Sequence, residues 1–84
     1  MTRYTVVWAK AARDELIDLW LQAANRNEVT AAVHRIDQQL AEDAPRQGAE
    51  LSEGLRAVLV PPLRVLFAVG ESDRVAEVLL VRLV

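Results

Sequence analysis

The spacing of apolar residues changes several times along this chain of 84 residues, and each change predicts a new element. The segment 2–8, TRYTVVW, is short and rich in β-branched and aromatic residues, which predicts a first strand. From residue 9 to residue 24 the apolar positions follow helical spacing, with charged residues on the other side. The apolar stripe of this predicted helix consists of Ala12, Leu16, Leu19, Trp20 and Ala23.

A second helical pattern follows the polar turn at residues 25–27. Asn27 is the expected N-cap, and Glu28 suits the positive end of the helix dipole. Pro45 and Gly48 end the pattern. Two helices joined by so short a turn form an antiparallel hairpin. The second apolar stripe consists of Val29, Ala32, Val33, Ile36 and Leu40.

The last third of the chain changes to β-forming residues. Residues 44–54 hold proline, glycine and serine without a sustained period, which predicts a connecting loop. Three β-rich runs follow at 55–60, 63–69 and 74–84, and their short connections predict an antiparallel meander. The order β-α-α-β-β-β predicts one α+β domain over residues 1–84, with the helical hairpin packed on a small, mainly antiparallel sheet.

Composition narrows the function classes. Hydrophobic residues make up 52% of the chain, enough for one core, and the absence of cysteine excludes disulfides, thiolate nucleophiles and cysteine-based zinc sites. No apolar run is long enough for a signal peptide or for crossing a bilayer, so we expect a cytoplasmic protein without membrane contact. The net charge of −2 gives no general attraction to nucleic acid, so any basic patch has to be local.

Most candidate catalytic residues have a simpler structural interpretation. His34, the only histidine, lacks partners at a recognisable spacing and is expected on a helix surface or in the helix seam. Asp14 and Asp18 lie one helical turn apart and are expected on a solvated face. Trp8 and Trp20 are expected to pack in the core. The three glycines form no phosphate-binding loop, and we expect neither a cofactor nor a metal.

Three arginines within the predicted strands remain as site candidates: Arg56, Arg64 and Arg82. Because side chains alternate along a strand, Arg56 shares one side with Val58 and Val60. The position of Arg64 depends on the turn at Pro61-Pro62: a three-residue loop places Arg56 and Arg64 on one face, and a two-residue loop places them on opposite faces. Since proline cannot adopt the positive φ of a primed two-residue turn, we expect the odd-length loop and a shared face.

On a shared face the two guanidinium groups would converge and bind a phosphate or carboxylate. The alternative is that each arginine reaches the rim of the sheet or pairs with an acid such as Glu77. The pattern of residues leaves both open.

The order of elements and two short motifs resemble the RelE/ParE superfamily of toxins from bacterial type II toxin–antitoxin systems. That family carries a Gly-Leu-Arg segment at the start of its second strand, matched here by residues 54–56. It also carries a Gly-Pro-Tyr-Arg-Val-like segment followed by an aromatic residue, matched here by Pro62, Arg64, Val65 and Phe67 at the same spacing. The resemblance runs from about Tyr4 to Arg82, and Pro61 and Leu63 replace the glycine and tyrosine of the family.

The resemblance implies a cytoplasmic toxin of the kind linked to plasmid stabilisation, with a cognate antitoxin as its partner. The chain stops at Val84, where the members that cleave messenger RNA carry basic and aromatic catalytic residues, so we expect the ParE-like activity: binding to DNA gyrase. In that reading Arg56, Arg64 and Arg82 are binding residues. One alternative is a RelE-like, ribosome-dependent endoribonuclease acting on messenger RNA, in which Arg64 and Arg56 would be catalytic. Another is a member without toxicity that only binds an antitoxin-like partner or forms a homodimer.

Overall fold

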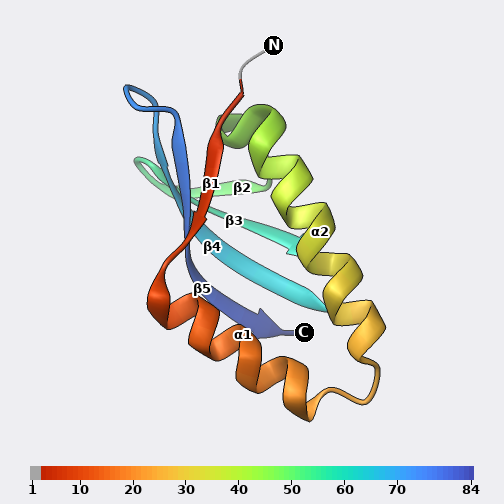
Figure 1. The fold of residues 1–84 in the computed structure, drawn as a ribbon. Coiled ribbons are helices and arrows are strands. Elements are labelled where there is room, and N and C mark those ends of the chain that lie inside the picture. Colours follow the sequence, from red (N-terminus) through yellow and green to blue (C-terminus); the bar gives the residue numbers. More distant parts are fainter. Residues whose placement is uncertain (1–2) are drawn as a thin grey trace.

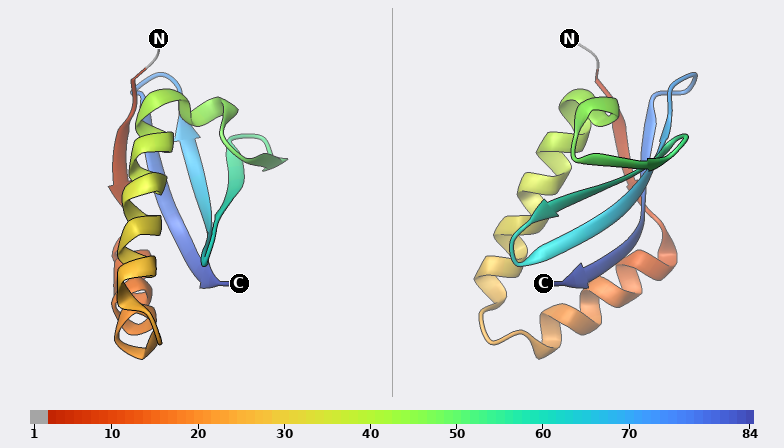
Figure 2. Two further views of the ribbon diagram at one scale, coloured as in Figure 1. Left: turned by 90° about the vertical axis from the view of Figure 1, so that its right-hand side faces the viewer. Right: turned by 180° about the vertical axis from the view of Figure 1, so that it is seen from behind.

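A computed structural model describes residues 3–84. Within this range two helices pack on one face of a five-stranded sheet with the strand order β1-β5-β4-β3-β2, which confirms the predicted two-layer α+β fold (Figures 1 and 2). The right-hand view of Figure 2 looks onto the sheet with both helices behind it, so one face of the sheet has no helix on it. No helix in this part of the chain is both long and apolar enough to cross a membrane.

The first strand, β1, spans Thr5–Trp8 and pairs in parallel with β5. Residue Thr2, where the predicted strand begins, lies outside the described residues. Because β1 covers only the first part of β5, the rest of that edge meets helix α1 instead, and the backbone N–H of Ala9 donates to the carbonyl of Val78 at 2.9 Å. The strand-to-helix junction is thereby anchored to β5.

The helical hairpin consists of α1, Lys10–Gln22, and α2, Arg26–Asp43, which is followed by a 3₁₀ turn at Ala44–Arg46. The predicted N-cap was wrong by two positions. The cap of α2 is Asn25, whose side chain accepts a hydrogen bond from the backbone N–H of Glu28 at 3.2 Å. The helix thus begins at the earliest Asn of the turn, and Asn27 lies within its first turn, where its side chain makes no cap.

A strand replaces part of the predicted loop at residues 44–54. Strand β2 spans Ala49–Ser52, lies at the edge of the sheet and pairs antiparallel with β3. All four of its residues are exposed, and the alternation of apolar and polar residues in Ala-Glu-Leu-Ser is too short to distinguish a strand from the surrounding loop. Its pairing with β3 defines it instead, and the left-handed φ values of Gly48 and Gly54, +65° and +78°, shape the backbone on either side.

The predicted meander is present as β3, Leu55–Val60; β4, Leu63–Gly70; and β5, Val75–Leu83. The predicted three-residue loop is wrong, because Val60 pairs with Leu63 across a two-residue turn. The Pro61-Pro62 peptide bond is cis. Both connecting residues are prolines, so this turn is not a primed one, and the argument from positive φ does not apply to it.

The core lies between the helices and the inner face of the sheet, which we define as the face that carries Val58, Val65 and Phe67. These strand residues alternate with exposed ones such as Leu59 and Arg64, as the period of a strand requires. The fully buried large side chains are Phe67, Ile36, Leu40, Leu63, Val29, Val65, Val78 and Val81. We call the opposite side of the sheet, which carries Leu59 and Arg64, the outer face.

Candidate functional site

Arg64 and Arg82 are neighbours on the outer face. Arg64 of β4 lies opposite Leu59 of β3 and opposite Arg82 of β5. All three side chains are exposed. The next row of the same face holds Leu66, which pairs with Leu80, so the two guanidinium groups border an apolar surface.

Arg82 forms an ion pair with Glu15 of α1, whereas Glu77 was the example named for the alternative in which an arginine pairs with an acid. The second carboxylate oxygen of Glu15 accepts a hydrogen bond from the backbone N–H of Val81 at 3.2 Å. Glu15 therefore accepts a hydrogen bond from the edge of β5 where β1 has ended, and it also holds the Arg82 side chain in place. Among residues 3–84, neither Arg64 nor Glu77 takes part in an ion pair.

Arg56 does not join this pair, so the predicted shared face of Arg56 and Arg64 is wrong. Arg56 pairs with the inward-facing Phe67, and the two-residue turn places Arg64 on the other side of the sheet. The guanidinium of Arg56 donates from Nε to the carbonyl of Gln47 at 2.8 Å and from Nη2 to the carbonyl of Gly48 at 3.1 Å. Arg56 thus holds the segment that leads into β2, which is a structural role.

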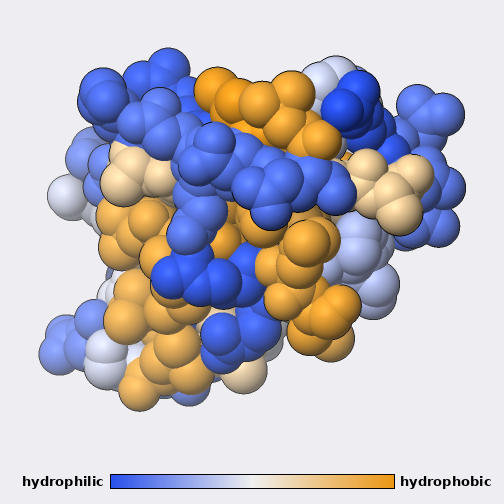
Figure 3. Space-filling model, turned by 90° about the horizontal axis from the view of Figure 1, so that it is seen from below, coloured by the Kyte–Doolittle hydropathy of each residue, from blue (hydrophilic) through white to orange (hydrophobic). Residues whose placement is uncertain are grey.

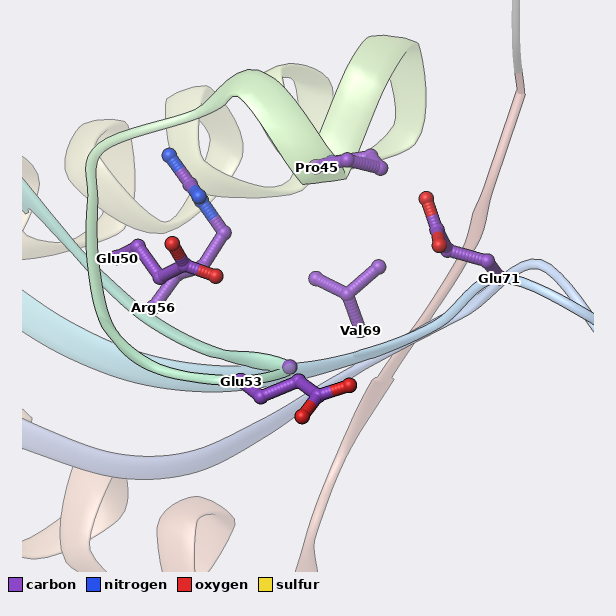
Figure 4. A pocket seen from close by; sticks show the side chains of 7 residues that line it. Pro45, Glu50, Glu53, Arg56, Val69 and Glu71 are labelled. Carbon is purple, nitrogen blue, oxygen red and sulfur yellow. The ribbon is translucent and has the colours of Figure 1, made fainter.

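A shallow pocket of about 370 Å³ lies beside Arg56 at the base of the β3–β4 pair. Figure 4 shows Glu50 next to Arg56, with Glu71 on the far side of Val69. The carboxylates are not brought together around a single point. Within residues 3–84 no group of three or more His, Asp or Glu side chains is arranged to hold a metal ion.

A second surface lies between the helices. An apolar groove of about 390 Å³ is lined by Leu16, Ile17, Trp20, Leu21, Val29, Thr30, Val33 and His34. The side chains of Ile17 and Leu21 are 56% and 54% exposed, which is unusual for large apolar residues on neighbouring helical turns. Figure 3, which views the molecule from below and so from the side of α1 in Figure 1, shows apolar side chains gathered there between hydrophilic ones.

Trp20 belongs to this groove, so the prediction that it packs in the core is wrong. It is 38% exposed, its indole N–H donates to the Thr30 hydroxyl at 3.1 Å, and the guanidinium of Arg26 lies 4.7 Å from the ring centroid. These contacts fix the ring as one wall of the groove. Trp8, in contrast, packs against the core and donates from its indole N–H to Asp37 of α2 at 2.8 Å.

Sequence reasoning missed Ile17 and Leu21. The signal was present, because residues 16–21 read Leu-Ile-Asp-Leu-Trp-Leu and carry more apolar residues than one buried stripe needs. A second stripe at positions 17 and 21 lies on one side of the helix, four residues apart. Such a stripe predicts a partner beyond the chain's own core.

The outer face presents charged groups and apolar area that are suited to binding. A general base must lie within hydrogen-bond reach of the proton it removes. Glu77 lies two rows from Arg64 on the outer face, and Glu15 is engaged by Arg82 and by the Val81 N–H. The face therefore offers one free guanidinium, one guanidinium held by a carboxylate, and apolar contact area.

Comparisons with known proteins support this architecture. No protein-family model and no curated protein matches the chain. Among solved structures, the chain is similar to a chain of the toxin–antitoxin complex RelBE2 from Mycobacterium tuberculosis, with 22% identity and a TM-score of 0.82 over 100% of this chain and 94% of that one. It is also similar to a chain of the chromosomal ParDE toxin–antitoxin system from P. aeruginosa, with 20% identity and a TM-score of 0.67 over 98% and 97% of the two chains. The chain thus has the α+β fold found in RelBE and ParDE toxin–antitoxin complexes, as the resemblance predicted.

Proposed function

We propose that this protein is the toxin of a type II toxin–antitoxin system, that it acts in the cytoplasm, and that it inhibits a protein target by binding, as the ParE-like branch acts on DNA gyrase. The observation that carries this proposal is the composition of the outer face. Arg64 and Arg82 border leucines there, and among residues 3–84 no free acid or base lies beside Arg64. Apolar area with an arginine anchor is typical of protein interfaces, in which arginine is enriched.

A second candidate is a RelE-like endoribonuclease, favoured by the cross-strand pairing of Arg64 with Arg82. Two neighbouring guanidinium groups stabilise the charge that develops on a phosphate during cleavage. The reaction also requires groups that activate the 2′-hydroxyl and protonate the leaving oxygen. Within residues 3–84 the acid in contact with these arginines, Glu15, is held by Arg82 and by the Val81 N–H, so we place this candidate second.

The test is induced expression in bacteria without any antitoxin, followed by two assays on the purified protein: DNA supercoiling by gyrase and message cleavage in a translating extract. We expect growth arrest, inhibited supercoiling and intact messages. We expect Arg64→Ala to reduce the inhibition at least tenfold, about 1.4 kcal/mol, because a charge-assisted contact is lost. Arg35→Ala, which removes an exposed arginine from α2, serves as the matched control.

Cleaved messages that disappear with Arg64→Ala would establish the ribonuclease in place of gyrase binding. If the folded protein is harmless when induced, the remaining function is the binding of an antitoxin-like partner.

We propose further that the antitoxin lays an apolar helix stripe in the α1–α2 groove. The groove is lined almost wholly by apolar side chains and is open along α1, as helix-in-groove recognition requires. We expect Leu21→Asp to leave toxicity and stability unchanged, because this side chain is exposed, and to abolish rescue by the co-expressed antitoxin.

The measurement is growth during co-expression with the cognate antitoxin, whose short reading frame we expect beside the gene of this protein. Leu51→Asp changes an equally exposed leucine on β2 and should keep the rescue. If the antitoxin still rescues cells that carry Leu21→Asp, the groove is not its binding site.

A further inference from the structure

The outer face carries a charge pattern that is complementary to itself. Three successive rows across β4 and β5 are Arg64 with Arg82, Leu66 with Leu80, and Ala68 with Glu77. The positive row and the row with the acid therefore lie on opposite sides of a central leucine row. In the described residues Arg64 and Glu77 are both without an ion-pair partner, although they lie on the same face.

A β-bulge creates this pattern. The register between β4 and β5 shifts after the Leu66–Leu80 pair, so that Phe67 pairs with Val78 and Leu79 is the additional residue. Without the shift, Val78 would face outward and Glu77 would face the core. The bulge keeps Val78 buried and at the same time presents Glu77 on the outer face.

We infer that the outer face binds the outer face of a second copy of this chain, around a two-fold axis that runs along the Leu66–Leu80 row. A rotation about this axis keeps the leucine row in place and exchanges the rows on its two sides. The Arg64–Arg82 row of one copy then lies over the Ala68–Glu77 row of the other. Leu66 and Leu80 meet their own counterparts at the centre, and a two-fold interface of this kind is isologous.

The charges select this arrangement over the other face-to-face arrangement. If the axis ran along the strands instead, the arginine rows of the two copies would meet and repel each other. With the axis along the leucine row, Glu77 lies under Arg82 of the partner copy and one strand, about 5 Å, to the side of its Arg64. The glutamate and arginine side chains together span this offset and the sheet spacing of about 10 Å. Glu77 of each copy thereby becomes the ion-pair partner of Arg64 in the other copy, a partner that neither side chain has within its own described residues.

Apolar area supports a second copy as the occupant. Leu59 is 55% exposed, Leu79 is 37% exposed and Val7 is 42% exposed on or beside this face. A stable interface needs roughly 800 Å² from each partner. The monomer exposes 5301 Å², so the outer face has to supply about 15% of the exposed surface. Two sheets that pack face to face lie about 10 Å apart.

This inference does not depend on the proposed function, because the association of the purified protein is measured without any target or antitoxin. In the dimer Arg64 would be covered, so dimer formation and target binding through Arg64 would exclude each other.

The test is sedimentation equilibrium of the purified protein over a range of concentrations. We expect a species of twice the 9.4 kDa monomer mass, which dissociates as the concentration falls. Glu77→Arg and Arg64→Glu should each weaken association at least tenfold by placing like charges opposite each other. The double variant exchanges the charges of positions 64 and 77 and should restore most of the association, because Arg82 of the partner copy is already paired with its own Glu15. Circular dichroism verifies folding, which these exposed positions should not affect.

Cross-linking provides an independent measurement, because the chain has no cysteine of its own. In the proposed dimer the two copies of position 66 face each other, so Leu66→Cys should be joined to its counterpart by a thiol-specific linker of about 10 Å. Ile17→Cys in the helical groove lies on the other side of the molecule and should remain unlinked. A single monomeric species up to the solubility limit would overturn the inference, and so would a dimer whose association the two charge reversals leave unchanged.

Discussion

Replacing Gly48 with alanine should destabilise the protein by about 3 kcal/mol or more, with a large fall in the unfolding midpoint. A Cβ at this position would lie 2.0 Å from the carbonyl oxygen of Ala57 and 2.7 Å from its carbon, and both of these atoms belong to the backbone of β3. Gly48 also has a φ of +65°, which costs a residue with a side chain a further 1 kcal/mol or so. The clash can be relieved only if β2 moves away from β3.

Gly54→Ala is the matched control for this prediction. Gly54 has a similar φ of +78°, but the nearest atom to an added Cβ would be 3.8 Å away. The control should therefore show the conformational cost alone, about 1–2 kcal/mol. Urea denaturation followed by circular dichroism measures both variants. Equal losses of stability would contradict the close approach of Gly48 to β3.

Phe67→Ala should cost about 3–5 kcal/mol, which is a large part of the stability of a small domain. Phe67 is fully buried on the inner face at the centre of the sheet, between β3 and β5. Its removal leaves a cavity that the rigid strands around it cannot close. The same urea experiment measures the effect.

Leu59→Ala is the control from the opposite side of the sheet. Leu59 is 55% exposed on the outer face, so at concentrations at which the protein is monomeric the change should alter stability by about 0.5 kcal/mol or less. The contrast between the two variants tests which face of the sheet is buried. A large loss with Leu59→Ala would mean that the outer face is covered even in the isolated chain.

Local signals in the sequence were sufficient for much of this fold. The change from helical spacing to β-rich runs predicted both helices and the meander, because each period reflects which side of an element is buried. The alternation of side chains along a strand was also enough to predict that Arg56 lies on the same side of β3 as Val58 and Val60. Strand β2 was missed because all four of its residues are exposed and only pairing with β3 defines it.

The candidate site was harder to predict, because it depends on relations between strands. Placing Arg64 relative to Arg56 required the length of the Pro61-Pro62 turn, and one residue of difference moves a side chain to the other face. Local conformational preferences favoured the wrong length. The ion pair between Glu15 and Arg82 joins residues that lie 67 positions apart, and no local pattern relates them.

The sequence by itself thus determined the order and type of most elements and the alternation within each strand, since both depend on neighbouring residues. The tertiary structure decided which arginines meet, which acid each of them contacts and what lies on the uncovered face of the sheet. Turn length and the bulge at Leu79 set these features by changing the register between strands. Register is fixed by packing across the whole sheet, which is why Arg56 holds the segment before β2 while Arg64 lies on the outer face.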